Sequence, residues 1–191
     1  MTGEKNIYTA EMPHSEKSIH LYAARQYDFF QKKQKCLVVL LSFLLIVAGL
    51  LIGADAWQGA LLLLAGCVAV TNLYAAPKHA ANAVVKKFNG ALPVIRYRFH
   101  ADHVDISTSP VPVYYDALTL LAEDKNYLYL FLTPQTGYMI DKALVTGSGG
   151  YDGLAEMLEQ ASKTKIQHAS GLNMNSLKAI MANIRKRRKN P

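Results

Sequence analysis

The segment HADHVD at residues 100–105 gathers the side chains of this chain that are best suited to metal chemistry. It carries four potential ligands, His100, Asp102, His103 and Asp105, and imidazole together with carboxylate is a common donor set for zinc. Along a strand, however, successive side chains point to opposite faces, and aspartate is favoured in tight turns. We therefore expect these residues to form the polar turn of a β-hairpin, and we expect no metal site.

Two further motifs match known kinds of site only in part. The glycine-rich sequence GSGG at residues 147–150 precedes a predicted helix, where exposed backbone N–H groups can bind an anion. It lacks the Lys and Ser/Thr that follow the glycines of a P-loop, so we expect a flexible connector. Ser107 and Ser109 lie near His103 in the sequence, but no nucleophile-elbow motif surrounds them. The sequence predicts neither an enzyme nor a bound cofactor.

Two apolar runs, residues 36–53 and 59–76, precede these motifs. Neither run contains a Lys, Arg, Asp or Glu, and a helix of about 18 residues is roughly 27 Å long, close to the ~30 Å hydrocarbon core of a bilayer. The short connection between them includes Asp55 and Trp57, which suit a membrane interface. This pattern predicts a transmembrane helical hairpin, and a soluble buried hairpin is the alternative.

Basic residues at the ends of the runs predict the orientation of this hairpin. Lysines precede the first run and follow the second, whereas the loop between the runs has none; they are Lys32, Lys33, Lys35, Lys78, Lys86 and Lys87. Because Lys and Arg resist translocation, we expect both termini in the cytoplasm. No signal peptide is expected, because a long and mostly polar segment precedes the first run. The predicted location is the bacterial inner membrane, with a multi-pass topology.

Small side chains within the runs indicate close packing between helices. Gly49 and Gly53 form a GxxxG pair, which we expect to close the hairpin on itself; contact between two copies of the chain is the alternative. Cys36 and Cys67 have no partner at redox or metal-ligand spacing, so they are expected to act as small apolar side chains. The few other polar groups in the runs are Ser42, Thr71 and Asn72.

Amphipathic helices are predicted on both sides of the hairpin. Residues 15–35 place Ile19, Tyr22 and Phe30 near helical spacing with charges between them, and residues 77–89 repeat this theme. Upstream of both lies the short segment of residues 6–12. We expect that segment to be a strand that closes onto a later sheet.

From residue 92 the apolar pattern changes from helical to alternating, which predicts strands. Polar and proline-containing turns separate five expected antiparallel strands of a meander, at residues 95–101, 104–108, 113–122, 127–133 and 138–145. Asp152 is expected to cap a following helix, and the apolar face of that helix is Leu154, Met157, Leu158 and Ala161. The predicted fold class is membrane α+β, with a small, partly open barrel and a C-terminal helix, as in pleckstrin-homology and GRAM modules.

The motifs HADHVDISTS, YYDALTLLAEDKNYLYLFL and GYMIDKALV, placed after the predicted hairpin, resemble the bacterial YcxB-like family. The resemblance at motif level covers residues 95–160. It implies a membrane-tethered, pleckstrin-homology-like module and provides no catalytic residues. The expected organisation is a cytoplasmic N-terminal segment (1–35), the hairpin (36–76), a juxtamembrane linker helix (77–93), the YcxB-like module (94–162) and a basic tail (163–191).

The net charge of +7 comes from this tail, because residues 163–191 contain no Asp or Glu while residues 78–162 contain more acids than bases. An apolar stripe at helical spacing, Leu177, Ile180, Met181 and Ile184, leads into the cluster Arg185, Lys186, Arg187, Arg188 and Lys189. Beside the inner leaflet such a cluster favours anionic lipid headgroups. A merely solvated tail is the alternative, and the slightly acidic module makes nucleic acid an unfavourable partner.

Together these features predict a membrane-tethered binding or scaffolding module. Its expected contacts are membrane lipids and either a protein partner or a second copy of the chain. The alternative is a small membrane enzyme or transporter accessory subunit whose site forms only with another subunit. Under that alternative, activity would depend on Asp55, Asn72 or His100.

Overall fold

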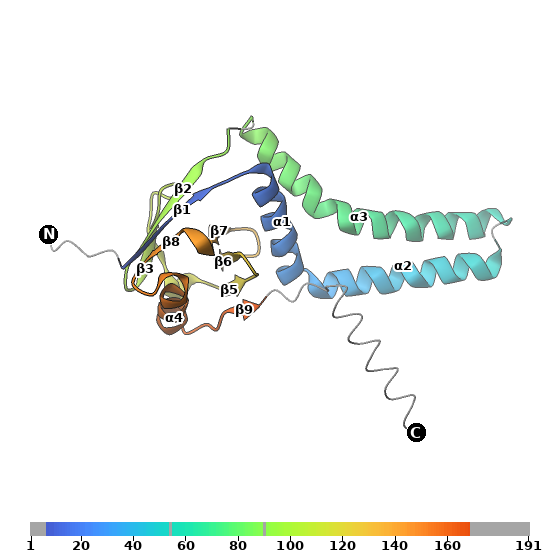
Figure 1. The fold of residues 1–191 in the computed structure, drawn as a ribbon. Coiled ribbons are helices and arrows are strands. Elements are labelled where there is room, and N and C mark those ends of the chain that lie inside the picture. Colours follow the sequence, from blue (N-terminus) through green and yellow to red (C-terminus); the bar gives the residue numbers. More distant parts are fainter. Residues whose placement is uncertain (1–6, 54, 90, 169–191) are drawn as a thin grey trace, which may run out of the picture.

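The computed structural model describes residues 7–53, 55–89 and 91–168, and these form the α+β fold that the sequence predicts (Figure 1). The helices are α1 (Glu16–Phe30), α2 (Lys32–Ile52), α3 (Trp57–Lys87) and α4 (Gly150–Ser162), with two short 3₁₀ turns, η1 (Tyr115–Ala117) and η2 (Lys142–Leu144). The strands are β1 (Tyr8–Pro13), β2 (Val94–Phe99), β3 (His103–Ile106), β4 (Val113–Tyr114), β5 (Leu120–Glu123), β6 (Tyr127–Phe131), β7 (Gly137–Asp141), β8 (Val145–Gly147) and β9 (Gln167–His168).

The N-terminal strand β1 lies inside a sheet with partners on both sides. That sheet has the order β4-β3-β2-β1-β8, and β1 pairs antiparallel with β2 and with β8. Tyr8 lies opposite Phe99 on one side and opposite Gly147 on the other. The strand expected near residues 6–12 is therefore confirmed, and the sheet module includes residues from before the apolar helices as well as residues after them.

The strands after residue 92 do not form the single meander that the sequence predicts. A second sheet has the order β7-β6-β5-β9, and the chain passes between the two sheets at η1 and at η2. Each 3₁₀ turn interrupts a segment that was predicted as one strand, 113–122 and 138–145 respectively. At η2 the carboxylate of Asp141 accepts a hydrogen bond from the Ala143 amide, which stabilises the turn. The prediction of five continuous strands is wrong at these two places.

One hydrophobic core lies between the sheets and includes side chains from both. Tyr97 and Phe99 of β2, together with Leu121 of β5 and Leu130 of β6, are almost completely buried. Strand β2 alternates exposed arginines with these buried aromatics, as expected for a strand with one face in the core. Every side chain of β6 from Leu128 onward is buried, which shows that both faces of that strand are covered.

Helix α4 covers one part of this core. Its buried residues are Leu154 and Leu158, and Met157 and Ala161 pack against the core, so the predicted apolar face is confirmed. The predicted cap is wrong: Gly149, in a left-handed conformation, is the N-cap, and Asp152 lies in the first turn of the helix. Because the N-cap residue is glycine, no side chain at this position accepts a hydrogen bond from the first turn of α4.

Helix α1 covers the second sheet rather than continuing into the apolar helix. Ser15 and Ser18 form a reciprocal capping box at its start, and the helix ends at Phe30, with Gln31 between it and α2. Tyr22 and Phe30 lie against Phe131 of β6, with ring centroids 5.8 and 5.1 Å apart. The predicted helix over 15–35 is thus two helices, and the first belongs to the sheet module.

Helices α2 and α3 lie side by side and project from the module as a long arm (Figure 1). Glycines allow their close approach: a Cβ at Gly49 would lie 2.8 Å from Leu63 Cγ, and a Cβ at Gly59 would lie 2.1 Å from the Gly53 carbonyl oxygen. This contact lies within one chain, as expected from the GxxxG pair.

Helix α3 bends by 44° between its parts Trp57–Leu73 and Ala75–Lys87. Pro77 lies inside the helix and has no N–H for the carbonyl one turn earlier, which explains a bend at this point. The linker predicted as a separate helix over 77–93 is therefore the second part of α3, and it packs beside α1.

Among the described residues, α2 is the helix that is long and apolar enough by itself to cross a membrane. Only 11% of its most apolar stretch of 18 residues is buried against the rest of the protein. The prediction of one apolar crossing helix over residues 36–53 is therefore supported. Helix α3 is long and apolar enough to cross a membrane only when the two parts on either side of its bend are taken together. A second crossing at 59–76 is not shown.

Candidate functional site

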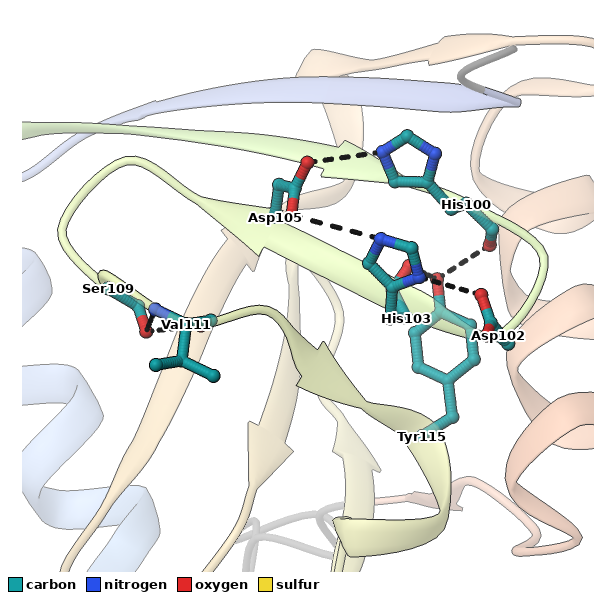
Figure 2. Close-up of polar contacts among 7 residues, drawn as sticks. All are labelled: His100, Asp102, His103, Asp105, Ser109, Val111 and Tyr115. Carbon is teal, nitrogen blue, oxygen red and sulfur yellow. Dashed lines mark hydrogen bonds and ion pairs between the residues drawn. The ribbon is translucent and has the colours of Figure 1, made fainter. Parts of the chain in front are cut away.

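The turn between β2 and β3 places two histidines face to face (Figure 2). Phe99 pairs with Val104, and the next pair outward is His100 with His103. The backbone N–H of His100 donates to the carbonyl oxygen of His103 at 2.9 Å. Residues that oppose each other across a two-residue turn share one face of the hairpin, and Asp105 shares it because it lies two positions after His103. The expectation that alternation separates these side chains is therefore wrong for three of the four residues.

The three side chains form a compact cluster, here called the hairpin cluster: His100, His103 and Asp105. The imidazole rings are stacked, with centroids 4.5 Å apart and planes 10° from parallel. His100 Nε2 lies 3.3 Å from one carboxylate oxygen of Asp105, and His103 Nε2 lies 3.9 Å from the other. One donor atom from each of the three residues lies within 4.8 Å of the other two. The arrangement brings donor atoms of two imidazoles and one carboxylate close together on one face of the hairpin.

The fourth residue of the motif, Asp102, holds His103 from the outer side. Its Oδ1 is 2.6 Å from His103 Nδ1, so the imidazole N–H donates to the carboxylate and leaves Nε2 free toward Asp105 (Figure 2). This hydrogen bond to His103 keeps the pKa of the Asp102 carboxyl below its usual value. The motif therefore carries two carboxylates close to two imidazoles, a charge distribution that attracts cations.

His100 is the least accessible member of the hairpin cluster. Only 7% of its surface is exposed, and neither ring nitrogen makes a hydrogen bond with any described residue. The 3.3 Å approach of its Nε2 to Asp105 is close enough for an ion pair but does not meet hydrogen-bond geometry. Buried polar groups are nearly always satisfied, so an unsatisfied imidazole calls for a physical explanation.

Tyr115 lies in η1, where the chain passes from the first sheet to the second, and it fixes the backbone of the HADHVD motif. The single proton of its hydroxyl is shared between the carbonyl oxygens of His100 and His103, at 2.9 and 2.7 Å. Burial, with the nearby Asp102 carboxylate as a smaller contribution, raises the pKa of this hydroxyl, so it remains a donor. Sequence reasoning assigned no role to Tyr115, because the contact depends on where η1 turns the chain.

The other predicted site residues do not join the hairpin cluster. Ser107 Oγ accepts from the Arg96 amide, and Ser109 Oγ donates to the Val111 carbonyl at 2.6 Å (Figure 2). Both serines therefore stabilise local backbone. At the GSGG sequence, Gly147 has φ +140° and a Cβ there would lie 2.5 Å from a Tyr8 ring carbon. These glycines are needed for the corner between β8 and α4, which favours the predicted connector over an anion site.

The residues named for a partner-dependent site are far from one another. Asp55 lies in the connection between α2 and α3, at the tip of the arm (Figure 1). Asn72 is exposed on α3, and His100 directly follows β2 in the module. The structure therefore does not bring these three together. The basic cluster Arg185, Lys186, Arg187, Arg188 and Lys189 lies outside the described residues.

A second candidate site is an apolar cavity of about 340 Å³ between α1, the second part of α3 and the sheets. Ala23 of α1, Val84 of α3 and Met139 of β7 are among the side chains that line it. The Tyr22 hydroxyl, also in the lining, is buried and has no hydrogen-bond partner among the described residues. Burial raises the pKa of this hydroxyl, so it is a neutral polar group in a mostly apolar lining.

Comparison of the chain with protein-family models, with curated proteins and with solved structures finds no match in any of the three.

Proposed function

We propose that this chain is a two-pass protein of the bacterial inner membrane that holds a binding or scaffolding module at the cytoplasmic surface. The observation that carries the proposal is the apolar surface of the arm formed by α2 and the first part of α3. Large apolar side chains are exposed along both helices, among them Leu40, Leu51, Leu61 and Leu64. An exposed apolar surface of this extent is favourable in lipid and unfavourable in water.

The positions of charged and aromatic residues support the two-pass orientation. The arm joins the module at both of its ends, because α2 follows α1 and α3 leads into β2. Lysines cluster near both of these junctions. The tip has the exposed Trp57, which suits the lipid headgroup region. By the positive-inside rule, the module and both termini face the cytoplasm.

The proposed activity of the module is binding rather than catalysis, in line with the resemblance to the YcxB-like family and to pleckstrin-homology-like folds. The two sheets joined at η1 and η2, with α4 over the core, suit a partly open barrel of this kind. The apolar cavity beside α3 gives the module a recessed surface next to the membrane. A basic tail at residues 185–189 adds an expected contact with anionic lipid.

Cysteine labelling tests the topology. In a chain with Cys36 and Cys67 replaced by alanine, Gln58→Cys places one thiol at the arm tip, and Lys125→Cys places another on the exposed β5–β6 turn. A membrane-impermeant maleimide should label position 58 in intact spheroplasts and position 125 only after permeabilisation. Labelling of both positions, or of neither, in intact spheroplasts would contradict a two-pass arm.

Co-purification after mild crosslinking in native membranes tests the binding role. The full chain is compared with a chain that ends at His168, because β9 pairs with β5 and must be kept. A protein retained by both chains would establish the module as the binding element. If truncation abolishes retention, recognition lies in the tail; if neither chain retains a protein, the scaffolding proposal fails.

A further inference from the structure

We propose that the hairpin cluster, His100, His103 and Asp105, is a binding site for a divalent first-row transition metal ion such as Zn²⁺. The site forms within the β2–β3 hairpin, so the inference stands independently of the proposed membrane topology. Two imidazoles and one carboxylate are a donor set that zinc and its neighbours in the first row bind readily. With three protein ligands, at least one coordination position is left for water or for a donor from another molecule.

The distances between the donor atoms suit one shared ion. Both Nε2 atoms face the Asp105 carboxylate, at 3.3 and 3.9 Å from its two oxygens. Ligands about 2.0–2.2 Å from a tetrahedral ion are about 3.3–3.6 Å from one another. Because each imidazole lone pair lies in its ring plane, binding of one ion requires the His103 ring to tilt out of its parallel stack with His100 and the exposed Asp105 side chain to turn toward both rings.

The surroundings of the cluster prepare it for an ion. Asp102 accepts from His103 Nδ1, the outer hydrogen bond by which carboxylates orient histidine ligands at known metal sites. Tyr115 binds the carbonyl oxygens of both histidines and so fixes their backbone. His100 is buried with two unpaired nitrogens, and a metal at Nε2 would satisfy one of them. These observations come from different residues and agree.

A plain cluster of ion pairs explains the same geometry less well. The approach of His100 Nε2 to Asp105 does not meet hydrogen-bond geometry, so an ion-pair cluster leaves both ring nitrogens of His100 unsatisfied. A metal cation at Nε2 would satisfy one of them and would give the shared carboxylate a counter-charge.

The location of the cluster also permits exchange of an ion with solvent. Asp105 has half of its side chain exposed, whereas His100 is enclosed, so the cluster is a shallow site with an open side. The β2–β3 turn lies at the end of β2 that is remote from α3 (Figure 1). The cluster therefore lies on the part of the module that is remote from the arm.

Titration of the full chain in detergent micelles, after removal of metal with a chelator, tests the inference. Calorimetry with Zn²⁺ should give one site per chain, and Co²⁺ should give the visible absorption of a nitrogen- and oxygen-ligated ion. At known sites, loss of an outer-shell partner weakens metal binding roughly 10- to 100-fold. His103→Ala and Asp105→Asn each remove a ligand and should weaken binding by at least that much. Asp102→Asn should weaken it within that range.

Matched controls separate the cluster from other surface groups. His20→Ala removes a histidine of α1 that lies 3.9 Å from Glu16, and Asp116→Asn removes an exposed carboxylate of η1; both should bind Zn²⁺ as the unchanged chain does. Zn²⁺ should raise the melting temperature of the unchanged chain but not that of Asp105→Asn, whose folding is checked by circular dichroism. No binding by the unchanged chain, or equal binding by the cluster variants and the controls, would overturn the proposal.

Discussion

Asp124 is the side chain that fixes helix α1 to the β5–β6 turn. Its Oδ2 accepts from Arg25 Nε at 3.2 Å and from the Tyr129 hydroxyl at 2.8 Å, while its Oδ1 accepts from the amides of Asn126 and Tyr127. Only 9% of this side chain is exposed. Asp124→Ala should lower the free energy of unfolding by about 2 kcal/mol, because hydrogen bonds to a charged group are lost. Urea unfolding of the full chain in micelles measures the change.

The same residue should make stability depend on acid. Burial alone would raise the pKa of Asp124, but its hydrogen bonds to the Asn126 amide and the Tyr129 hydroxyl, with others, bring the pKa below the usual 3.8. A lowered folded-state pKa contributes stability that is present above 3.8 and is lost as the pH falls through the folded value. Unfolding measured from pH 5 down to pH 2 should lose less stability in Asp124→Asn than in the unchanged chain. Equal slopes would refute this assignment.

Tyr22 and Tyr97 offer a matched pair of hydroxyl deletions. Both line the apolar cavity, but the Tyr97 hydroxyl donates to the Met139 carbonyl at 3.2 Å, whereas the Tyr22 hydroxyl is unpaired among the described residues. Tyr97→Phe should lower the free energy of unfolding by about 1 kcal/mol, and Tyr22→Phe should leave it unchanged or raise it. Thermal unfolding of both variants decides this. A loss of stability in Tyr22→Phe would indicate a partner for its hydroxyl within the cavity.

At the scale of single residues, the sequence points to the motif that forms the hairpin cluster but not to the way its side chains are arranged. HADHVD contains every member of the hairpin cluster, and alternation along a strand was the correct rule. The error lay in the position of the turn, which was expected at residues 102–103 but is formed by residues 101–102, so that His100 and His103 become direct cross-strand neighbours. The contribution of Tyr115 was not predictable, because it depends on a turn between two sheets.

The arm is the element whose packing is most sensitive to side-chain size. A Cβ at Gly66 would lie 2.7 Å from Ile46 Cγ1 and 3.0 Å from the Ser42 carbonyl oxygen, whereas the neighbouring Ala65 is exposed. Gly66→Val should separate α2 from α3 and lower stability by about 1–3 kcal/mol. Ala65→Val adds bulk on the outer face and should have little effect. Spin-label distances between the two helices, together with melting temperatures, would show whether both expectations hold.

Helices and strands were predicted with unequal success, for a physical reason. Apolar runs and alternating segments depend on local periodicity, so α2, β2 and the apolar face of α4 were located correctly. The turns η1 and η2 interrupt apolar segments without glycine or proline inside them, so local pattern gave no sign that the chain changes sheets there. Pro77 did mark a bend, but the helix tolerated it and continued to Lys87.

The module as a whole is discontinuous in sequence, because the arm is inserted between α1 and β2. Since β1 lies between β2 and β8, a chain of residues 94–168 alone should lack the middle of its first sheet and fail to fold. A chain in which a Gly/Ser linker of about 15 residues replaces residues 31–92 keeps β1 and α1 and should fold in water. Such a linker has an average span of roughly 22 Å, comparable with the length of α1.

Circular dichroism and size-exclusion chromatography of these two soluble chains test this expectation. A control with the linker and with Tyr8→Asp should unfold, because Tyr8 is buried between Phe99 and Gly147 in the first sheet. If residues 94–168 fold as well as the linked chain, β1 is dispensable and the module is continuous after all.

The position of β1 also sets an order of events during synthesis. Thr9 pairs with Thr146, 137 residues later in the chain, so β1 leaves the ribosome long before one of its two neighbouring strands exists. At about 5–20 residues per second, translation of the intervening chain takes roughly 7–27 s. During that interval β1 still has an unpaired edge, a form that readily associates with other strands. If the arm enters a bilayer as proposed, its integration can begin before the sheet closes, and delayed integration would prolong the exposure of this edge to aggregation.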